Sequence, residues 1–310
     1  MRSTKDCLPP EYYIDQMTRE EASLLMSWAV AEGWNPGTAD LEVAWGYDPG
    51  AFIALRRRPE DAGDVDELVG GGAILSYGGQ AGFMGLFIMR SDHRRRGLGR
   101  VLWHERLRRL RARLQPTAWI GMDGVLDMAP FYAAGGFHYL YRDVRYEGVA
   151  PSTPAAETRP SALRLVPVSD VPFDRLSSFD ESIFGVLRGD FLRRWTAAQG
   201  SKTCAALLGS EHGDAALVGY AVLRPCQVGY KLGPVFADDA VVARALVHEL
   251  IAQCPSEQIQ IDVPELNGAA VEIATTLGWT PTFACARMAY GQAPLNAHSK
   301  VFGVTSFEFG

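Results

Sequence analysis

Apolar and polar positions alternate along the chain in blocks that predict strands and helices in a regular order. In the first 149 residues the order is one strand, two helices, three strands, a helix, a strand, a helix and a final strand over 137–146. The first helix begins at Thr18, which has Glu21 three positions later, the pattern of a capping box. Short strands mixed with amphipathic helices predict an α/β fold with a mixed (α+β) sheet.

The same order of elements returns in the second half of the chain. Both halves also contain a short segment that ends in glycine and an aromatic residue, Tyr132-x-x-x-Gly-Phe over 132–137 and Ala274-x-x-x-Gly-Trp over 274–279. The stretch between the halves is rich in proline and small residues, as linkers are. We interpret this pattern as an internal duplication, with domains over 1–149 and 163–310 joined by a linker over 150–162.

The strand-to-helix turn over residues 94–100 carries the strongest chemical signal. An apolar run over 85–89 precedes it, and apolar residues at helical spacing follow it. The turn contains Arg94-x-x-Gly97-x-Gly99, and it lacks both the Gly-Lys-Ser/Thr of a P-loop and the third glycine of a dinucleotide fingerprint. Glycine lets the backbone approach a ligand, and the free amides of a helix N-terminus favour a phosphate or pyrophosphate. A basic turn before a solvated helix is the alternative interpretation.

Composition narrows the classes of function. The 310 residues are 47% hydrophobic and 21% charged, which is typical of a globular protein with room for two domains. A net charge of -6 argues against a general nucleic-acid binder and suits a cationic substrate. The five cysteines form no Cys-x-x-Cys pair, so we expect no metal site and no disulfide framework. Without an apolar run of membrane length or a signal-peptide core, we expect a soluble cytoplasmic protein with no membrane partner.

The glycine turn and its surroundings resemble those of a known family. Arg-x-x-Gly-x-Gly after a strand and before a long helix resembles the acyl-CoA pyrophosphate loop of the GNAT N-acetyltransferases, and the element order over 11–149 matches their fold. The whole chain resembles bacterial tandem-GNAT proteins, including the segments 32–37 and 300–310. The resemblance implies two tandem GNAT-fold domains and an acetyl-CoA-dependent N-acetyltransferase, an acyltransferase, acting as a monomer or homodimer.

The second half departs from this pattern at two positions. Residues 234–239 read Pro-Val-Phe-Ala-Asp-Asp where the first half has the glycine turn, and Ala274 stands in the place of Tyr132. The carboxylates of Asp238 and Asp239 would repel a diphosphate. We therefore expect the second domain to be a degenerate GNAT domain that has lost acyl-CoA binding.

The resemblance implies which residues meet the acyl donor. Arg94 is expected to support the loop while the amides of the following residues contact phosphate. The edge of the strand before the loop is expected to pair with the pantetheine arm, and a backbone N–H there would polarise the thioester carbonyl. Core packing is the other interpretation of the apolar residues in this set. The cofactor-binding residues implied are Phe87, Ile88, Met89, Arg94, Arg95, Arg96, Gly97, Leu98, Gly99, Arg100, Asp127 and Tyr132.

The chemistry also needs an acid and a base. The resemblance implies Tyr132 as the general acid that protonates the leaving sulfur, and a half-buried structural tyrosine is the alternative. Val125 stands where the family often has asparagine, which leaves the role of Asp127 open. Asp123, at the end of a predicted strand, is the candidate base, or else a turn residue before Gly124. The candidate acceptor-binding residues are Trp34, Asn35 and Asp40 between the first two helices, and Asp262 and Glu265 of the second domain.

Other polar residues have a simpler interpretation. We expect His93 and His104 to be exposed to solvent, and the arginines of the helix after the glycine turn to form its solvated face. The expected acceptor is the primary amine of a small cationic molecule: a polyamine, an amino sugar, an amino acid or an amine antibiotic. A protein or peptide lysine acetyltransferase and a non-catalytic acyl-CoA or metabolite sensor remain the alternatives.

Overall fold

The computed structural model describes residues 7–59, 61, 65–152, 160–209, 215–293 and 297–310. Most of the predicted linker, residues 153–159, lies outside that range. The helices are α1 (Arg19–Ala31), α2 (Asp40–Tyr47), α3 (Leu98–Arg111), α4 (Ala129–Ala134), α5 (Phe173–Phe184), α6 (Gly189–Thr196), α7 (Ala240–Ile251) and α8 (Gly268–Thr276). The predicted capping box opens α1: the amide of Glu21 donates to Thr18 Oγ1 at 3.2 Å, and the amide of Thr18 donates to the Glu21 carboxylate at 2.7 Å.

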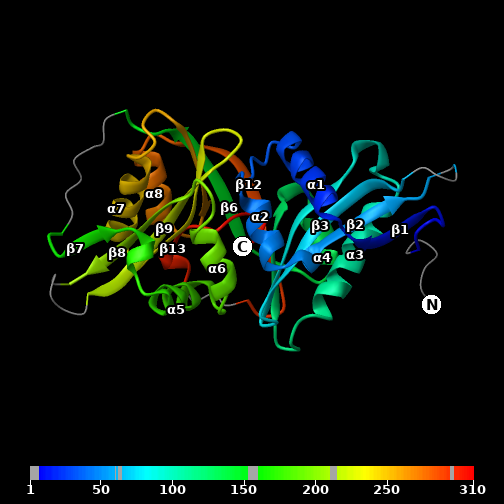
Figure 1. The fold of residues 1–310 in the computed structure, drawn as a ribbon, viewed down its shortest axis with the longest axis horizontal. Coiled ribbons are helices and arrows are strands. Elements are labelled where there is room, and N and C mark those ends of the chain that lie inside the picture. Colours follow the sequence, from blue (N-terminus) through cyan, green and yellow to red (C-terminus); the bar gives the residue numbers. More distant parts are fainter. Residues whose placement is uncertain (1–6, 60, 62–64, 153–159, 210–214, 294–296) are drawn as a thin grey trace.

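The strands join into one mixed sheet that runs through both halves (Figure 1). Their order across the sheet is β1-β2-β3-β4-β5-β12-β6-β11-β10-β9-β8-β7, and β13 pairs with β10. The strands are β1 (Tyr12–Gln16), β2 (Phe52–Arg57), β3 (Glu67–Tyr77), β4 (Ala81–Met89), β5 (Trp119–Val125), β6 (His138–Val149), β7 (Leu163–Val166), β8 (Lys202–Leu208), β9 (Ala216–Pro225), β10 (Tyr230–Ala237), β11 (Gln258–Pro264), β12 (Thr280–Tyr290) and β13 (Val301–Gly303).

The two halves exchange their last long strands. In the sequence, β6 is the last strand of the first half and β12 the last long strand of the second. In the structure β12 pairs antiparallel with β5 of the first half, and β6 pairs antiparallel with β11 of the second half. The exchanged strands also pair with each other at the centre of the molecule. Side chains from both halves are therefore neighbours on adjacent strands.

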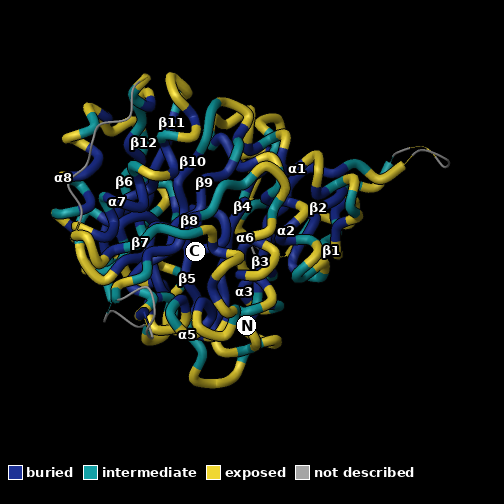
Figure 2. Tube along the Cα trace, turned by 60° about the vertical axis from the view of Figure 1, so that its left-hand side comes forward, coloured by how far each residue is buried: buried dark blue, intermediate teal, exposed yellow. Residues whose placement is uncertain are grey.

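One hydrophobic core crosses the boundary between the halves. Tyr47 at the end of α2 and Tyr77 of β3 both pack against Phe191 of α6, with ring centroids 5.7 and 5.4 Å apart. Figure 2 shows buried segments continuing across the strands of both halves, with exposed residues on the outer turns and helices. The segment 304–310 is buried in this core, and the Tyr77 hydroxyl donates to the Phe309 carbonyl at 2.5 Å.

Strand β4 bulges and then separates from β5. Leu86 and Phe87 together stand opposite the single residue Gly72 of β3, and Leu86 has a φ of 53°. The parallel pairing of β4 with β5 covers only the segment from Ala81 to Phe83. Beyond Phe83 the two strands diverge, and the opening between them leads to the turn before α3.

Candidate active site

The turn between β4 and α3 presents its backbone to solvent. Gly97 adopts a φ of 82° and Arg95 a φ of 61°, and both are exposed. A Cβ atom on Gly97 would meet no protein atom within 4 Å, so the space in front of the turn is open. Leu98 is buried and begins α3, whose first amides have no partner inside the helix. This geometry can bind a phosphate group.

Arg94 fixes this turn to the rest of the first half. Its Nε donates to the Met89 carbonyl at 2.8 Å, and its Nη2 pairs with Glu32 at the end of α1. Arg96 and Arg100 are exposed beside the turn. Arg94 thus supports the loop, while its neighbours add positive charge to the surface around it.

Arg106 of α3 is fully buried beneath the bulge of β4. Its Nη2 donates to the carbonyls of Ala73 and Gly85, each at 2.6 Å, and its guanidinium lies 5.2 Å from the ring centroid of Phe87. Burial lowers the pKa of Arg106 to about 9. The expectation that every arginine of this helix is solvated is therefore wrong. Arg106 follows Leu102 by four positions, so its place in the apolar stripe could have indicated burial.

A cavity of about 60 Å³ lies in the opening between β4 and β5. It has room for roughly four to six groups of the size of a water molecule. Tyr132 of α4 lines it and packs on Gly124 of β5, where a Cβ atom would lie 2.3 Å from the tyrosine ring. Burial raises the pKa of Tyr132 to about 12, so the hydroxyl carries its proton at neutral pH. Both halves build the cavity, since its other walls are Trp34, Met84, Gly85, Leu86, Phe87, Met122, Asp123, Val125, Phe283, Cys285, Phe307 and Glu308.

Asp123 lines the same cavity but is bound to an arginine of the exchanged strand. Arg287 of β12 donates to its two oxygens at 2.6 and 2.7 Å and lies 3.1 Å from a carboxylate oxygen of Asp143 on β6. Burial raises the pKa of Asp123 to about 6 and raises the pKa of Asp143 well above its usual value. Two carboxylates beside one guanidinium therefore bind a proton at higher pH than ordinary aspartates do.

The acid pair predicts how stability depends on pH. An acid whose pKa is higher in the folded than in the unfolded chain stabilises the fold as the pH falls and destabilises it as the pH rises. The Asp143→Asn variant keeps the shape of the side chain but cannot become negatively charged. We expect it to melt higher than the wild type by roughly 2 °C or more at pH 8 and to lose this advantage toward pH 5.

The control is Asp15→Asn, which changes an exposed acid on β1. Its melting temperature should follow that of the wild type at both pH values. An Asp143→Asn variant that melts lower than the wild type by the same amount at pH 5 and pH 8 would contradict the raised pKa.

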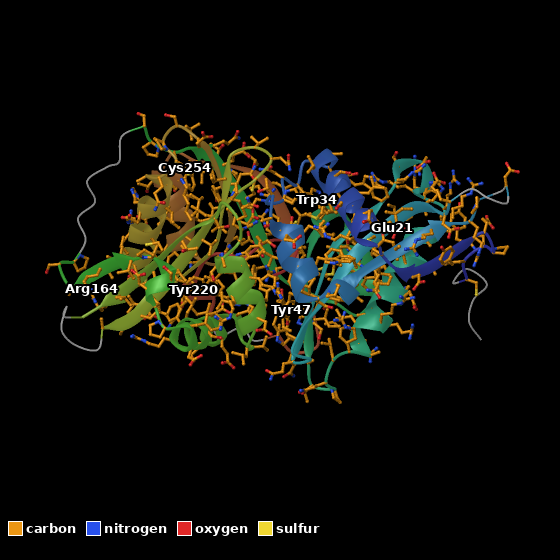
Figure 3. All side chains as sticks on the ribbon, viewed as in Figure 1. Glu21, Trp34, Tyr47, Arg164, Tyr220 and Cys254 are labelled. Atoms are coloured by element: carbon orange, nitrogen blue, oxygen red, sulfur yellow. The ribbon has the colours of Figure 1, made fainter. Side chains whose placement is uncertain are left out.

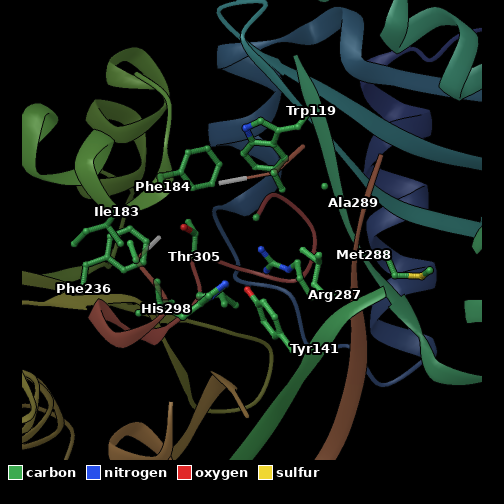
Figure 4. A pocket seen from close by; sticks show the side chains of 17 residues that line it. Trp119, Tyr141, Ile183, Phe184, Phe236, Arg287, Met288, Ala289, His298 and Thr305 are labelled. Carbon is green, nitrogen blue, oxygen red and sulfur yellow. The ribbon is translucent and has the colours of Figure 1, made fainter. Parts of the chain in front are cut away.

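A second cavity, of about 70 Å³, lies on the other side of Arg287 (Figure 4). Tyr141, His298 and Arg287 converge at one end of it, and the rings of Tyr141 and His298 are 4.8 Å apart. Thr305 Oγ1 and His298 Nε2 are buried there without a hydrogen-bond partner among the described residues. Burial, with Arg287 nearby, lowers the pKa of His298, so its ring is neutral at neutral pH. Such a lining can hold ordered water.

Glu308, which the sequence pattern did not single out, is a wall residue of the first cavity. Its side chain is 3% exposed, and Oε2 is buried without a hydrogen-bond partner among the described residues. The backbone of Glu308 crosses β4 at Gly85, where a Cβ atom would lie 2.0 Å from the Glu308 carbonyl oxygen. A buried acid in an otherwise apolar segment, Ser-Phe-Glu-Phe-Gly over 306–310, was the available signal.

The acceptor-binding candidates lie in different surroundings. Trp34 lines the cavity and lies where the two halves meet (Figure 3). Asn35 donates to the Val228 carbonyl at 3.0 Å and to Gln260 at 3.1 Å, so it joins the halves. The remaining three are paired with arginines: buried Asp40 with Arg224, buried Asp262 with Arg145, and Glu265 with Arg142.

Three further residues complete the comparison with the sequence. Asp127 is exposed in a 3-10 turn before α4, outside the cavity lining. His104 is exposed, as expected. The expectation for His93 is wrong, since the ring is buried beside Tyr12 with Nδ1 3.1 Å from the Asp92 carboxylate.

The equivalent opening in the second half is closed. Strand β13 pairs antiparallel with β10 at Val235 and Phe236, where β10 has passed the end of its pairing with β11. Asp239 caps α7 by accepting from the amide of Val242 at 2.9 Å, and Asp238 pairs with Lys300 at 2.8 Å. The chain itself thus fills the place that stays open between β4 and β5.

Two further properties concern the part of the chain that the structure describes. No helix there is long and apolar enough to cross a membrane. No group of three or more histidine, cysteine, aspartate or glutamate residues there is arranged to hold a metal ion.

Comparisons with known proteins agree with this architecture. Solved structures resemble nearly the whole chain. One is a protein of Pyrococcus horikoshii that is provisionally assigned as an acetyltransferase. Its TM-score is 0.75 at 22% identity, and the superposition covers 100% of this chain and 99% of that one. A tandem GNAT protein from the clavulanic acid biosynthesis pathway has a TM-score of 0.61 at 16% identity, covering 92% of this chain and 100% of that one. At these identities the likeness shows the fold.

The sequence itself matches acetyltransferases. The holothin acyltransferase of Pseudoalteromonas sp. (strain SANK 73390) is 26% identical over 94% of this chain and 92% of its own length. YitH of Bacillus subtilis (strain 168), named an uncharacterized N-acetyltransferase, is 24% identical over 80% of this chain and 81% of its own length. The profile of the Acetyltransferase (GNAT) family matches residues 14–137, and that of an Acetyltransferase (GNAT) domain matches residues 176–303. This chain therefore belongs to the GNAT superfamily of acetyltransferases and carries two GNAT domains in tandem.

Proposed function

We propose that this protein transfers an acetyl group from acetyl-CoA to the primary amine of a small molecule. The observation that carries the proposal is the cavity between the diverging strands β4 and β5, which a protonated Tyr132 lines, together with the open turn at Gly97 that follows β4. GNAT domains generally use acetyl-CoA. The first half has the features that such a donor needs: free helix amides, a basic surface and an unpaired strand edge.

The donor end of the site is built on backbone. The turn from Arg95 to Arg100 would hold the pyrophosphate, with Arg94 keeping it in place. The backbone at Leu86 and Phe87 would direct an N–H toward the thioester carbonyl, and Arg106 fixes that bulge through the Gly85 carbonyl. One such donor typically lowers the barrier by about 3 kcal/mol.

Tyr132 is the group that can protonate the departing sulfur. A thiol has an ordinary pKa of about 8.5, well below that of this tyrosine, so the proton moves fully only as the C–S bond breaks. Asp123 is less suited to act as a free base, because Arg287 occupies both of its oxygens.

The acceptor is proposed to be small because both halves enclose the cavity. The second half closes one side of the cavity with Phe283 of β12 and Phe307 of the segment 304–310. Trp34 of the first half closes another side of the cavity. An extended peptide would need an open groove instead. The similarity to a protein named holothin acyltransferase also supports a small-molecule acceptor.

One site per chain follows from the closed second half. We expect calorimetric titration with coenzyme A to give a stoichiometry of one per chain, because β13 fills the second opening and Asp238 and Asp239 repel phosphate there. The Gly97→Val variant should abolish the binding heat completely. Residual binding of one coenzyme A in that variant would mean that the second half binds the donor.

The function itself is tested by thiol release. Acetyl-CoA is incubated with the protein and a panel of monoamines, diamines, amino sugars, amino acids and a lysine peptide, and free thiol is measured. Turnover with a small amine supports the proposal, and turnover with the peptide alone would favour a protein acetyltransferase. Tight coenzyme A binding without turnover on any amine would favour a sensor.

A further inference from the structure

Among the described residues that line the cavity, Glu308 has a carboxylate without a hydrogen-bonding partner. No hydrogen bond joins either of its oxygens to another described residue, and Oε2 is buried. A buried polar group without a partner costs free energy, so such a group is retained where a ligand satisfies it. The other carboxylate of the lining, Asp123, has both oxygens bound by Arg287.

The backbone around Glu308 is held firmly. Ser306 Oγ accepts from the amides of Glu308 and Phe309 at 3.2 and 3.0 Å. The Phe309 carbonyl is bound by Tyr77, and Gly85 lets the Glu308 carbonyl lie directly on β4. Glu308 therefore has a fixed position one residue from the bulge at Leu86, where the thioester carbonyl would lie.

The charged groups around Glu308 are bound to other partners. Arg145 of β6 pairs with Asp262 of β11, and Arg224 of β9 pairs with Asp40 of α2. On β10, Lys231 is buried and donates to the Trp34 carbonyl at 3.2 Å. None of these three cations donates a hydrogen bond to Glu308.

Apart from Tyr132 and the arginine-bound Asp123, the rest of the lining is largely apolar. Its aromatic rings and thioethers belong to Trp34, Met84, Phe87, Met122, Phe283 and Phe307. Such a wall favours an acceptor molecule whose body is apolar. One unpartnered carboxylate can satisfy one cationic nitrogen of that acceptor. A second cationic nitrogen would be buried without a partner, which is costly.

We propose that Glu308 binds the ammonium group of the acceptor and accepts its proton, and that the acceptor is a singly charged amine with an apolar body. This inference rests on the proposed function and deepens it. Glu308 takes one proton from the ammonium, and the neutral nitrogen attacks the thioester carbon. The C–N bond forms and the C–S bond breaks. Tyr132 gives a proton to the sulfur and recovers one from the nitrogen, and Glu308 releases its proton to solvent.

The first test uses the wild-type protein alone. An alkyl monoamine is compared with a diamine of equal chain length by thiol release. We expect kcat/KM to be at least about tenfold higher for the monoamine, since one unpaired buried charge costs at least about 1.4 kcal/mol. A diamine or polyamine that is the better substrate would overturn the inference. No turnover with any amine would overturn the proposed function and this inference with it.

The second test separates the proton-accepting role from a structural one. Glu308→Gln is assayed with ethylamine as the alkylamine and with its trifluorinated analogue, whose three β-fluorines keep the nitrogen largely neutral at neutral pH. We expect kcat/KM to fall by about 100-fold or more for the alkylamine and by less than about tenfold for the analogue. A structural defect would lower both equally, and equal losses would overturn the inference while wild-type turnover still supports the proposed function.

Two controls accompany this variant. Glu272→Gln changes an exposed glutamate on α8 and should leave both rates unchanged. Glu308→Asp keeps the charge and should restore part of the alkylamine rate. If Glu308→Gln does not fold, the ratio of the two rates in Glu308→Asp decides the question: a larger loss for the alkylamine supports the inference, and equal losses overturn it.

Discussion

Replacing Tyr132 with phenylalanine is expected to lower kcat by about 100-fold or more while coenzyme A binds with nearly unchanged affinity, because a general acid typically contributes a factor of this size. The variant removes one hydroxyl from a ring that packs on Gly124 and lies 6.1 Å from the Trp103 ring centroid. The ring and its packing remain. The phosphate turn is formed by other residues, so donor binding does not depend on the hydroxyl.

The measurements are steady-state thiol release and calorimetric titration with coenzyme A. Tyr139→Phe is the matched control, because Tyr139 is an exposed tyrosine on β6 and does not line the cavity. Its kcat should equal that of the wild type. Unchanged turnover in Tyr132→Phe would remove this tyrosine as the acid, and a parallel loss of coenzyme A affinity would assign it to binding.

Replacing Gly97 with valine is expected to abolish coenzyme A binding. A β-branched residue is strained at a φ of 82°, at a cost of order 1–3 kcal/mol. The protein itself offers open space at this position, so the side chain would occupy the volume that the pyrophosphate needs. Loop distortion and ligand exclusion act in the same direction. We expect no binding heat at coenzyme A concentrations that saturate the wild type.

Gly78→Val is the control for backbone strain. Gly78 also has a positive φ, 57°, and a Cβ atom there would meet nothing within 4 Å. It lies in the turn between β3 and β4, away from the phosphate turn. We expect this variant to lose some thermal stability and to bind coenzyme A normally. If both variants lost binding together, the effect at Gly97 would come from strain and the assignment of the turn would be contradicted.

Much of the architecture was predictable because it depends on local patterns. The capping box at Thr18 and Glu21 formed as predicted. The order of strands and helices in both halves follows the periodicity of apolar residues, and the glycine turn has positive φ at Gly97. These features depend on interactions between residues close in sequence, so the sequence displays them directly.

Burial of charged residues was less predictable. Arg106 was expected on a solvated face and lies beneath the bulge of β4, while His93 was expected to be exposed and is covered. Asp40 and Asp262 were expected at the acceptor site and are paired with Arg224 and Arg145. A charge pattern gives the number of ionisable groups, but the partner of each group depends on strands distant in sequence.

By itself the sequence determined the duplicated order of elements, the glycine turn after β4 in the first half and the absence of such a turn after β10 in the second. The tertiary structure alone decided that β6 and β12 change places, that β13 fills the second opening, and that Glu308 reaches the cavity of the first half. The physical reason is that a strand edge accepts any partner of compatible register and burial. Which of two similar strands binds a given edge is settled by the packing of the whole core, and the local pattern of either strand is the same in both arrangements.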